Sequence, residues 1–448
     1  MRRFLLALLA CVAAVVAPSA QTANARPNVV LIITDDVGYG DIGSYGAPDI
    51  RTPNIDRLAA RGTRFTDFYA NASSCTPTRA GLISGRYQQR FELERPLGAA
   101  STADGEIGLP ATGRSLPQLL RNHGYVTALV GKWHLGYLPQ FSPLVHGFDS
   151  FWGYKSGYVD YYQHTDSTGQ PDLFDGEERT KAEGYLTDLI TQKSVQYIAD
   201  HARQPFFLEV AYSAAHWPYQ VPDKPSTAER NSAHMLAFHE NTGTRQDYVK
   251  IMERADAGVG QIVAAIEQAG IAANTLVIFT NDNGGEWLSR NSPLFNRKFT
   301  LWEGGIRVPA IVSWPGRLPA GRVTSQVGIT MDLTATIVAV TGAPVPAEAK
   351  LEGMNLLPIL ERKAPVTDRT LFWRVRTAGL DQRAVRSGSW KLLHEGTSRL
   401  SLFDLSKDIS ERNDLSFVRT DIVRRLNEQL IAWEKDVDAE AGSRAPRK

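Results

Sequence analysis

Four apolar runs rich in β-branched and aromatic residues alternate with segments of helical periodicity, and this alternation constrains the fold most. Each run has the continuous apolar character of a strand that is buried on both faces. Strands that alternate with helices predict an α/β fold with a large, mostly parallel sheet flanked by helices. The predicted strands are Asn28–Thr34, Tyr125–Val130, Phe206–Tyr212 and Thr275–Thr280, and the predicted helices include Pro53–Arg61, Ser115–His123 and a longer one from about Tyr248 to Ile266.

Polar residues follow each of the four predicted strands. In open sheets of this kind, ligands bind just beyond the carboxyl ends of the strands. One charged loop after a strand would be weak evidence for a ligand-binding site, but four of them favour a shared site. The segments are Asp35-Asp36, Gly131–His134, the region of His216, and Asn281–Gly285.

Asp35, Asp36, Asp282 and Asn283 form a candidate metal site. Adjacent carboxylates repel each other unless a cation neutralises them. A set of oxygen donors without cysteine or histidine suits Ca²⁺, with Mg²⁺ as the alternative. The competing interpretation is that these acids belong to loops or cap helices. Asp282 and Asn283 disfavour it, because they supply matching oxygen donors at the end of a second strand.

The N-terminus has the features of a secretory signal, which we place at residues 1–23. Arg2 and Arg3 precede an apolar run, and small residues follow it. We therefore expect export to the periplasm or the extracellular space. A lipoprotein site at Cys11 is disfavoured, because it lies very early and the apolar run continues beyond it. No later segment predicts a membrane span.

Cys75 is then the only cysteine that remains after cleavage. It is either a small buried hydrophobic residue or the precursor of a catalytic group. Pro77 is predicted to be the first residue of a helix, which would put Cys75 just before a helix N-terminus, where an anion is favoured. Net charge is +1 with acids and bases interspersed, and this balance does not favour a nucleic-acid partner.

The segment Cys75-Thr76-Pro77-Thr78-Arg79 resembles the signature of the type I sulfatase family. The resemblance extends over most of the chain in the order expected for that family. The similar segments are Ala80–Arg86, Asp35–Asp41, Thr52–Asp56, Gly131–Gly136 and Glu303–Pro309.

The resemblance implies an alkaline-phosphatase-like fold and a sulfuric ester hydrolase. It also implies that a formylglycine-generating enzyme oxidises Cys75 to Cα-formylglycine. The hydrated aldehyde would be a diol in which one hydroxyl, held on the metal, attacks sulfur and displaces the substrate alcohol, which leaves a sulfated diol. The second hydroxyl then loses its proton, and sulfate is expelled as the aldehyde re-forms.

The same resemblance implies a role for each matching residue. Lys132 and Lys298 would bind sulfate oxygens. Arg79 would hold the formylglycine oxygen, His134 would be the base for elimination, and His216 would bind the substrate and protonate the leaving alcohol. The metal ligands would be Asp35, Asp36, Asp282, Asn283 and the modified Cys75. The alternatives are surface lysines and structural histidines, and Arg297 is a rival to Lys298.

We expect a catalytic domain over residues 27–346 and a C-terminal subdomain over residues 347–448. Short antiparallel strands between Thr370 and Leu405 and a helix over Asp421–Val437 are predicted there. This subdomain resembles the small sheet and helix of sulfatases.

The expected substrate is a sulfated small molecule or saccharide. Several aromatic residues could stack on sugar rings, or they could simply pack in the core. The aromatic candidates are Trp152, Tyr154, Tyr158, Tyr161, Tyr162 and Trp217, and the histidines His164, His234 and His239 are further candidates for a pocket. The competing functions are a phosphonate monoester or phosphodiester hydrolase on the same fold, and a catalytically dead binding homologue.

Overall fold

The computed structural model describes residues 26–224, 243–377 and 379–442. The predicted signal at residues 1–23, His234 and His239 lie outside these ranges. Within them, no helix is long and apolar enough to cross a membrane.

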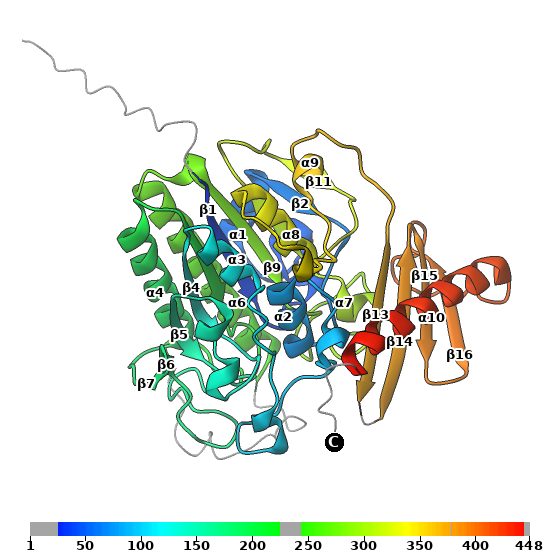
Figure 1. Ribbon diagram of the computed structural model, residues 1–448, viewed down its shortest axis with the longest axis horizontal. Coiled ribbons are helices and arrows are strands. Elements are labelled where there is room, and N and C mark those ends of the chain that lie inside the picture. The colour runs from blue at the N-terminus through cyan, green and yellow to red at the C-terminus, as the bar shows by residue number, and fades with distance from the viewer. Residues whose placement is uncertain (1–25, 225–242, 378, 443–448) are drawn as a thin grey trace, which may run out of the picture.

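A ten-stranded sheet runs through the centre of the molecule (Figure 1). Its order is β11 (Arg322–Thr324), β2 (Thr63–Phe65), β10 (Ala310–Ser313), β9 (Thr275–Asn281), β1 (Asn28–Thr34), β8 (Phe206–Ala211), β4 (Val126–Lys132), β5 (Ser150–Tyr154), β6 (Phe174–Asp175) and β7 (Glu178–Arg179). A two-stranded sheet pairs β12 (Gly328–Ile329) with β3 (Phe68–Tyr69).

The five strands β9, β1, β8, β4 and β5 are parallel neighbours. All seven residues of β1 are buried, because helices cover both faces of the sheet. The four predicted strands are β1, β4, β8 and β9, so the predicted α/β fold is confirmed. Antiparallel pairs flank this parallel core: β10 pairs with β9 and β2 on one side, and β6 pairs with β5 and β7 on the other.

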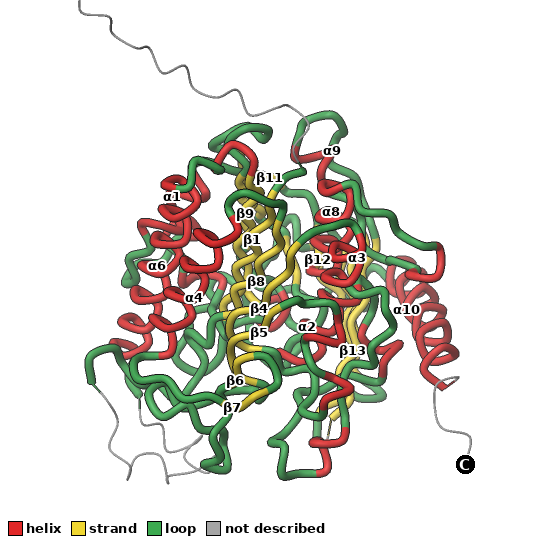
Figure 2. The backbone as a smooth tube through the Cα atoms, turned by 60° about the vertical axis from the view of Figure 1, so that its left-hand side comes forward, coloured by secondary structure: helices red, strands yellow, loops and turns green. Residues whose placement is uncertain are grey.

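Helices form a layer on each side of this sheet, as the edge-on view in Figure 2 shows. One layer contains α1 (Pro53–Ala60), α4 (Leu186–His201) and α6 (Arg245–Gln268), and the other contains α2 (Cys75–Ser84), α3 (Leu116–Asn122) and α8 (Thr330–Thr341). Each face of the sheet has its own apolar cluster, since alternate residues of each strand point to opposite faces.

Shorter helices lie in the connections between these elements. They are η1 (Tyr39–Asp41), η2 (Gly43–Tyr45), η3 (Gln88–Phe91), η4 (Ala103–Glu106), η5 (Pro139–Phe141), η6 (Leu144–His146), η8 (Ala272–Asn274), α7 (Glu303–Ile306), η9 (Ala347–Ala349) and α9 (Leu357–Leu360).

The predicted start of α2 at Pro77 is wrong. The helix begins at Cys75, after the extended residue Ser74. Pro77 is therefore the third helical residue. A proline is tolerated there because the first four backbone N–H groups of a helix have no partner within it. Cys75 consequently lies in the first turn of α2 instead of before it.

A four-stranded antiparallel sheet and the C-terminal helix pack against the main body. The elements are β13 (Thr370–Thr377), β14 (Leu380–Ser387), β15 (Trp390–Glu395), β16 (Arg399–Asp404) and α10 (Thr420–Gly442). A third apolar cluster lies between this sheet and the main body. Trp373 is fully buried in it and donates a hydrogen bond of 2.9 Å to the Ala70 carbonyl.

A buried ionic cluster joins the same two parts. Lys391 on β15 contacts Glu303 of α7 at 2.9 Å and Glu411 at 2.8 Å, and all three side chains are inaccessible to solvent. The cluster fixes the small sheet to α7 of the main body.

Candidate active site

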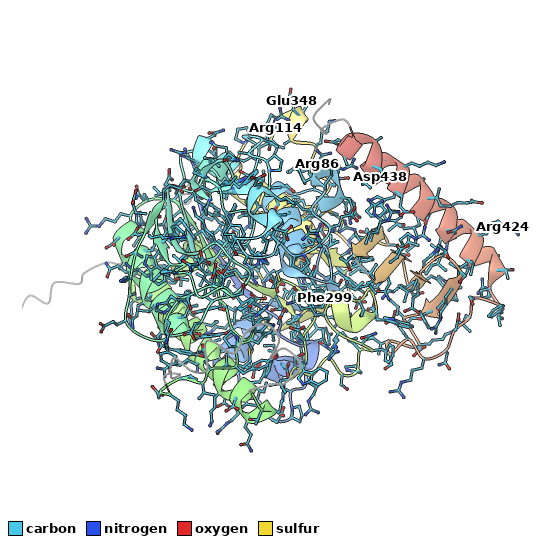
Figure 3. The ribbon with its side chains drawn as sticks, turned by 90° about the horizontal axis from the view of Figure 1, so that it is seen from below. Arg86, Arg114, Phe299, Glu348, Arg424 and Asp438 are labelled. Atoms are coloured by element: carbon cyan, nitrogen blue, oxygen red, sulfur yellow. The ribbon has the colours of Figure 1, made fainter. Side chains whose placement is uncertain are left out.

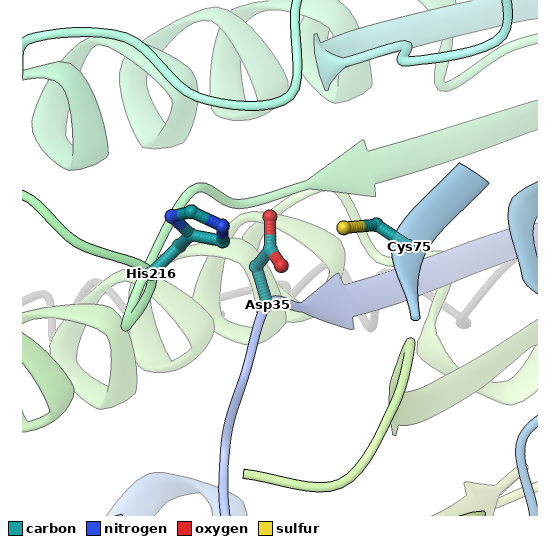
Figure 4. Close-up of side chains that lie close together, drawn as sticks. All are labelled: Asp35, Cys75 and His216. Atoms are coloured by element: carbon teal, nitrogen blue, oxygen red, sulfur yellow. The ribbon is translucent and has the colours of Figure 1, made fainter. Parts of the chain in front are cut away.

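The carboxyl ends of β1, β4, β8 and β9 bring the predicted residues together at one end of the sheet. Figure 3 views the molecule from below, the end at which these strands finish. Asp35 directly follows β1, and Cys75 reaches the same place from the first turn of α2 (Figure 4). Ligand atoms of Asp35, Cys75 and His216 lie within 4.8 Å of one another.

Three buried carboxylates form the centre of the site. Ligand atoms of Asp35, Asp36 and Asp282 lie within 4.8 Å of one another. Burial and the neighbouring Asp282 raise the pKa of Asp35 to about 8. Burial also opposes ionisation of Asp36, but Lys298 and His216 outweigh it and lower the pKa of that carboxyl. The raised pKa of Asp35 reflects an excess of negative charge in a dry environment.

The donor set fits a divalent cation. Asp35 Oδ1 and Asn283 Oδ1 are buried, and neither accepts a hydrogen bond from any residue that the structure describes. Asn283 Nδ2 donates to Asp36 Oδ1 at 2.7 Å, which directs the amide toward the carboxylates. Buried oxygens without partners are costly, and a cation would satisfy them and relieve the repulsion between the acids.

Arg79 and Lys132 already bind this acid cluster. Arg79 donates to Asp282 Oδ2 through Nη2 at 2.9 Å and through Nε at 3.1 Å. Lys132 Nζ forms a short ion pair with Asp35, and both side chains are fully buried. These two cations balance part of the negative charge.

Lys298, rather than its rival Arg297, reaches the site. Its Nζ donates to Asp36 Oδ2 at 2.7 Å, and the side chain lines the cavity that contains Cys75. Arg297 is exposed, and its guanidinium lies over the ring of Trp287. The backbone between Gly285 and α7 therefore directs neighbouring residues to opposite sides.

Cys75 is 2 % exposed, and burial raises the pKa of its thiol. Lys132 and Lys298 oppose that rise, while Asp35 and Asp282 add to it. An ordinary thiolate nucleophile needs the opposite shift. The environment of Cys75 therefore disfavours a reactive thiol.

His134 offers an unprotonated nitrogen next to the cavity. Its Nε2 lies 3.0 Å from the Leu97 carbonyl, an acceptor, so Nε2 carries the proton of the neutral ring. Nδ1 is buried and has no hydrogen-bond partner in the described chain. Burial lowers the pKa of His134 well below its usual value, and the backbone has φ 57°, an uncommon conformation.

His216 is held by the backbone and faces Asp36. Its Nδ1 lies 2.6 Å from the Trp217 carbonyl, and its Nε2 lies 3.4 Å from Asp36 Oδ2. Because the carbonyl accepts only, Nδ1 carries a proton, and Nε2 can donate only from the imidazolium. Burial lowers the pKa of His216 well below its usual value, although Asp36 opposes this shift.

A cavity of about 210 Å³ opens onto these residues. Of the six aromatic candidates, Tyr158 and Trp217 line this cavity, with ring centroids 3.9 Å apart. Trp152, Tyr154 and Tyr161 are buried in the core cluster and Tyr162 packs against it, so core packing explains those four. The lining also includes Cys75, Leu97, His134, Tyr137, His216, Lys298 and Phe299. His164 is buried elsewhere.

Three further residues support the site: Glu286, which no sequence motif identifies, and Tyr154 and Tyr158, which the sequence presents only as aromatic candidates for sugar stacking. Glu286 Oε2 lies 3.9 Å from Lys298 Nζ, and the ring of Tyr158 stacks on that of His216 at 5.5 Å. Tyr154 is fully buried, and its high pKa, raised by burial, is raised further by Asp35. Glu286 follows the Asp-Asn-Gly-Gly segment directly, and that position was the one available signal for it.

Two protein-family models match this chain, and known proteins are similar to it along most of its length. The sulfatase family model matches residues 27–343, and the model for the C-terminal part of N-sulphoglucosamine sulphohydrolase matches residues 291–436. N-acetylgalactosamine-6-sulfatase of Mus musculus is 35 % identical over 88 % of this chain and 77 % of its own length. Arylsulfatase A of Bos taurus is 34 % identical over 82 % of this chain and 75 % of its own.

A solved structure extends this similarity to three dimensions. The crystal structure of Ps i-CgsB in complex with k-i-k-neocarrahexaose matches with a TM-score of 0.82 and 31 % identity. The match covers 91 % of this chain and 92 % of that one. With the family model spanning most of the sequence and relatives above 30 % identity, the chain belongs to the sulfatase family, whose members hydrolyse sulfate esters.

Proposed function

We propose that this sulfatase removes sulfate from a saccharide, through a formylglycine made from Cys75 beside a bound Ca²⁺, with Mg²⁺ as the alternative ion. The observation that carries the proposal is the meeting of the Cys75, Asp35 and His216 ligand atoms within 4.8 Å. The names of the relatives above support a sugar substrate, as does the complex of Ps i-CgsB with a hexaose.

The proposed cation ligands are Asp35, Asp36, Asp282 and Asn283, together with the modified side chain at position 75. The cation would lower the pKa of a hydroxyl bound to it, and hydrated formylglycine would supply that hydroxyl as a nucleophile. Arg79 and Lys132 hold the carboxylates in position, because each contacts one of them.

The chain's own residues then bind the sulfate group and move protons. Lys298 lines the cavity and offers an ammonium to sulfate oxygens, where it balances developing negative charge. In its cationic form, His216 donates a proton from Nε2 to the leaving oxygen. His134 accepts a proton at Nδ1, the nitrogen without a partner among the described residues.

Tyr158 and Trp217 form the aromatic wall against which the sugar ring would stack. Export through a signal at residues 1–23, modification by a formylglycine-generating enzyme, and division into a catalytic domain at 27–346 and a subdomain at 347–448 complete the proposal. The C-terminal sheet would shape one side of the cleft.

The second candidate is hydrolysis of phosphonate monoesters or phosphodiesters. A phosphate monoester is a dianion and often requires two metal ions. The two groups of potential metal ligands in the described part of the chain share Asp35, so they describe one site and favour a monoanionic ester. A catalytically inactive homologue is disfavoured because the chain has Cys75 as the nucleophile precursor, the acids of the metal site, and both Lys132 and Lys298.

Turnover of an aryl sulfate and the matching aryl phosphate by one enzyme preparation tests the proposal. We expect kcat/KM to be higher for the sulfate by orders of magnitude, and Cys75→Ala to abolish that activity. A preference for the phosphate ester would contradict the proposal, and so would undiminished turnover by Cys75→Ala. A panel of sulfated saccharides then identifies the leaving group.

A further inference from the structure

Exposed aromatic side chains gather in the loop next to Lys298. Trp287 is 59 % exposed, Phe295 is 48 % exposed and Phe299 is 38 % exposed. Figure 3 labels Phe299, which also lines the cavity. Single exposed aromatics are ordinary, but three within one loop at the edge of a binding cavity suggest a contact surface.

Arg297 lies on this surface in a fixed orientation. Its guanidinium is 4.7 Å from the centroid of the Trp287 ring. It forms no ion pair with an acid in residues 26–224, 243–377 or 379–442, although Glu286 belongs to the same loop. A guanidinium held on an aromatic ring keeps its N–H groups available at its edge, and these match a sulfate or carboxylate bidentately.

The loop that carries Trp287 and Arg297 is braced internally. The Asn291 side chain accepts from Gly285 N at 2.9 Å and donates to the carbonyls of Gly285 at 3.0 Å and Asn296 at 3.1 Å. Lys298 N donates to the Gly285 carbonyl at 3.1 Å. These bonds hold both ends of the loop together, so ligand binding would cost little ordering entropy.

We propose that Arg297 and Trp287 form a second anion site, which binds a sulfate or carboxylate on the sugar next to the one that carries the scissile sulfate. The inference rests on the proposed saccharide substrate. Lys298 is buried and lines the cavity, whereas its chain neighbour Arg297 is exposed, and Phe299 on the other side of Lys298 also lines the cavity. A polyanionic chain leaving the cavity would meet Arg297 within one residue of the catalytic lysine.

The test is inhibition of aryl sulfate hydrolysis by hexasaccharides of chondroitin sulfate, heparin and carrageenan. We expect at least one to inhibit the wild type, and Arg297→Ala to raise its apparent inhibition constant about tenfold, the loss of one charge-assisted contact. Arg297→Lys should restore only part of the effect, and Trp287→Ala should weaken inhibition because the guanidinium loses its support.

Arg203→Ala is the matched control. Arg203 is an exposed arginine between α4 and β8, at the opposite end of the sheet, and its loss should leave inhibition unchanged. The inference fails if none of the hexasaccharides inhibits, or if Arg297→Ala and Arg203→Ala have equal effects. Without inhibitor, aryl sulfate turnover should be the same in all these variants. If the wild type does not turn over the aryl sulfate at all, the proposed sulfatase activity fails, and this outcome is distinct from a failure of the second anion site.

Discussion

Lys298 Nζ donates a hydrogen bond of 2.7 Å to Asp36 Oδ2, and both side chains are almost completely buried. The pair joins the loop after β9 to the end of β1. Burial opposes the charge on Lys298, but Asp36 outweighs it and raises the pKa of the ammonium well above its usual value. Lys298 therefore stays cationic inside a cavity that would receive an anionic ester.

Replacement of Lys298 by alanine should lower kcat for an aryl sulfate by a factor of about 10²–10³, the usual effect of removing one group that stabilises transition-state charge. The adjacent Arg297→Ala is the control and should retain full aryl sulfate turnover, because Arg297 faces away from the cavity. Equal losses in the two variants would show that the loop as a whole, rather than the Lys298 charge, supports the reaction. Steady-state kinetics on both proteins distinguishes these outcomes.

Chelation of divalent cations should abolish activity and lower the melting temperature. Without a cation, Asp35, Asp36 and Asp282 repel one another within 4.8 Å. A cation present at 100 times its Kd contributes about 2.7 kcal/mol to the free energy of unfolding. Calorimetry with EDTA, followed by separate additions of Ca²⁺ and Mg²⁺, measures the effect and identifies the preferred ion. Unchanged stability and activity after exhaustive chelation would rule out the metal site.

Glu209 should make stability depend on pH. It lies in the middle of β8, and burial raises its pKa from 4.5 to about 7. Between pH 4.5 and 7 the folded protein keeps a proton that the unfolded chain has released, so stability falls as pH rises through this window. The loss reaches about 3 kcal/mol once the folded state has also ionised.

Glu209→Gln cannot ionise, so its stability relative to the wild type should increase from pH 4.5 to 7 and then level off. Denaturant unfolding at a series of pH values measures the difference. A constant difference across the range would mean that Glu209 has the same pKa in both states.

Lys391→Met should destabilise the contact between the main body and the C-terminal sheet. Glu303 and Glu411 would remain buried with no cation between them. Breaking a buried ion pair in this way costs about 3–5 kcal/mol. The matched control is Lys407→Met, because Lys407 is 83 % exposed and its pair with Asp404 spans 3.6 Å. The control should change stability by less than about 0.5 kcal/mol. Thermal unfolding that shifts equally in both variants would contradict the prediction.

The sequence predicts the central strands well because each is a short apolar run buried on both faces. Asn28–Thr34 matches β1 at both ends, and Thr275–Thr280 is one residue shorter than β9. The antiparallel strands of the large sheet, such as Ala310–Ser313, escape prediction because they are short and their pairing depends on distant partners.

Most of the candidate site residues are recognisable because they follow strand ends, and Cys75, Arg79 and Lys298 because they lie in or near family motifs. The structure brings all ten of them together. The residues that contact and position these site residues are not recognisable in the same way. Glu286 contacts Lys298, and Tyr158 stacks on His216, only through tertiary packing that no local pattern encodes. The preference of proline for the first helical position predicts a helix start at Pro77, but proline is also tolerated two residues later, where the structure places it.

The proposed chemistry depends above all on the modification of Cys75. Mass spectrometry of the peptide that carries Cys75, isolated from enzyme purified from its native host and assayed for aryl sulfate turnover, tests this modification. We predict an aldehyde in place of the thiol, visible as a lighter peptide that reacts with a hydrazide reagent. An unmodified thiol at Cys75 in fully active enzyme would contradict it.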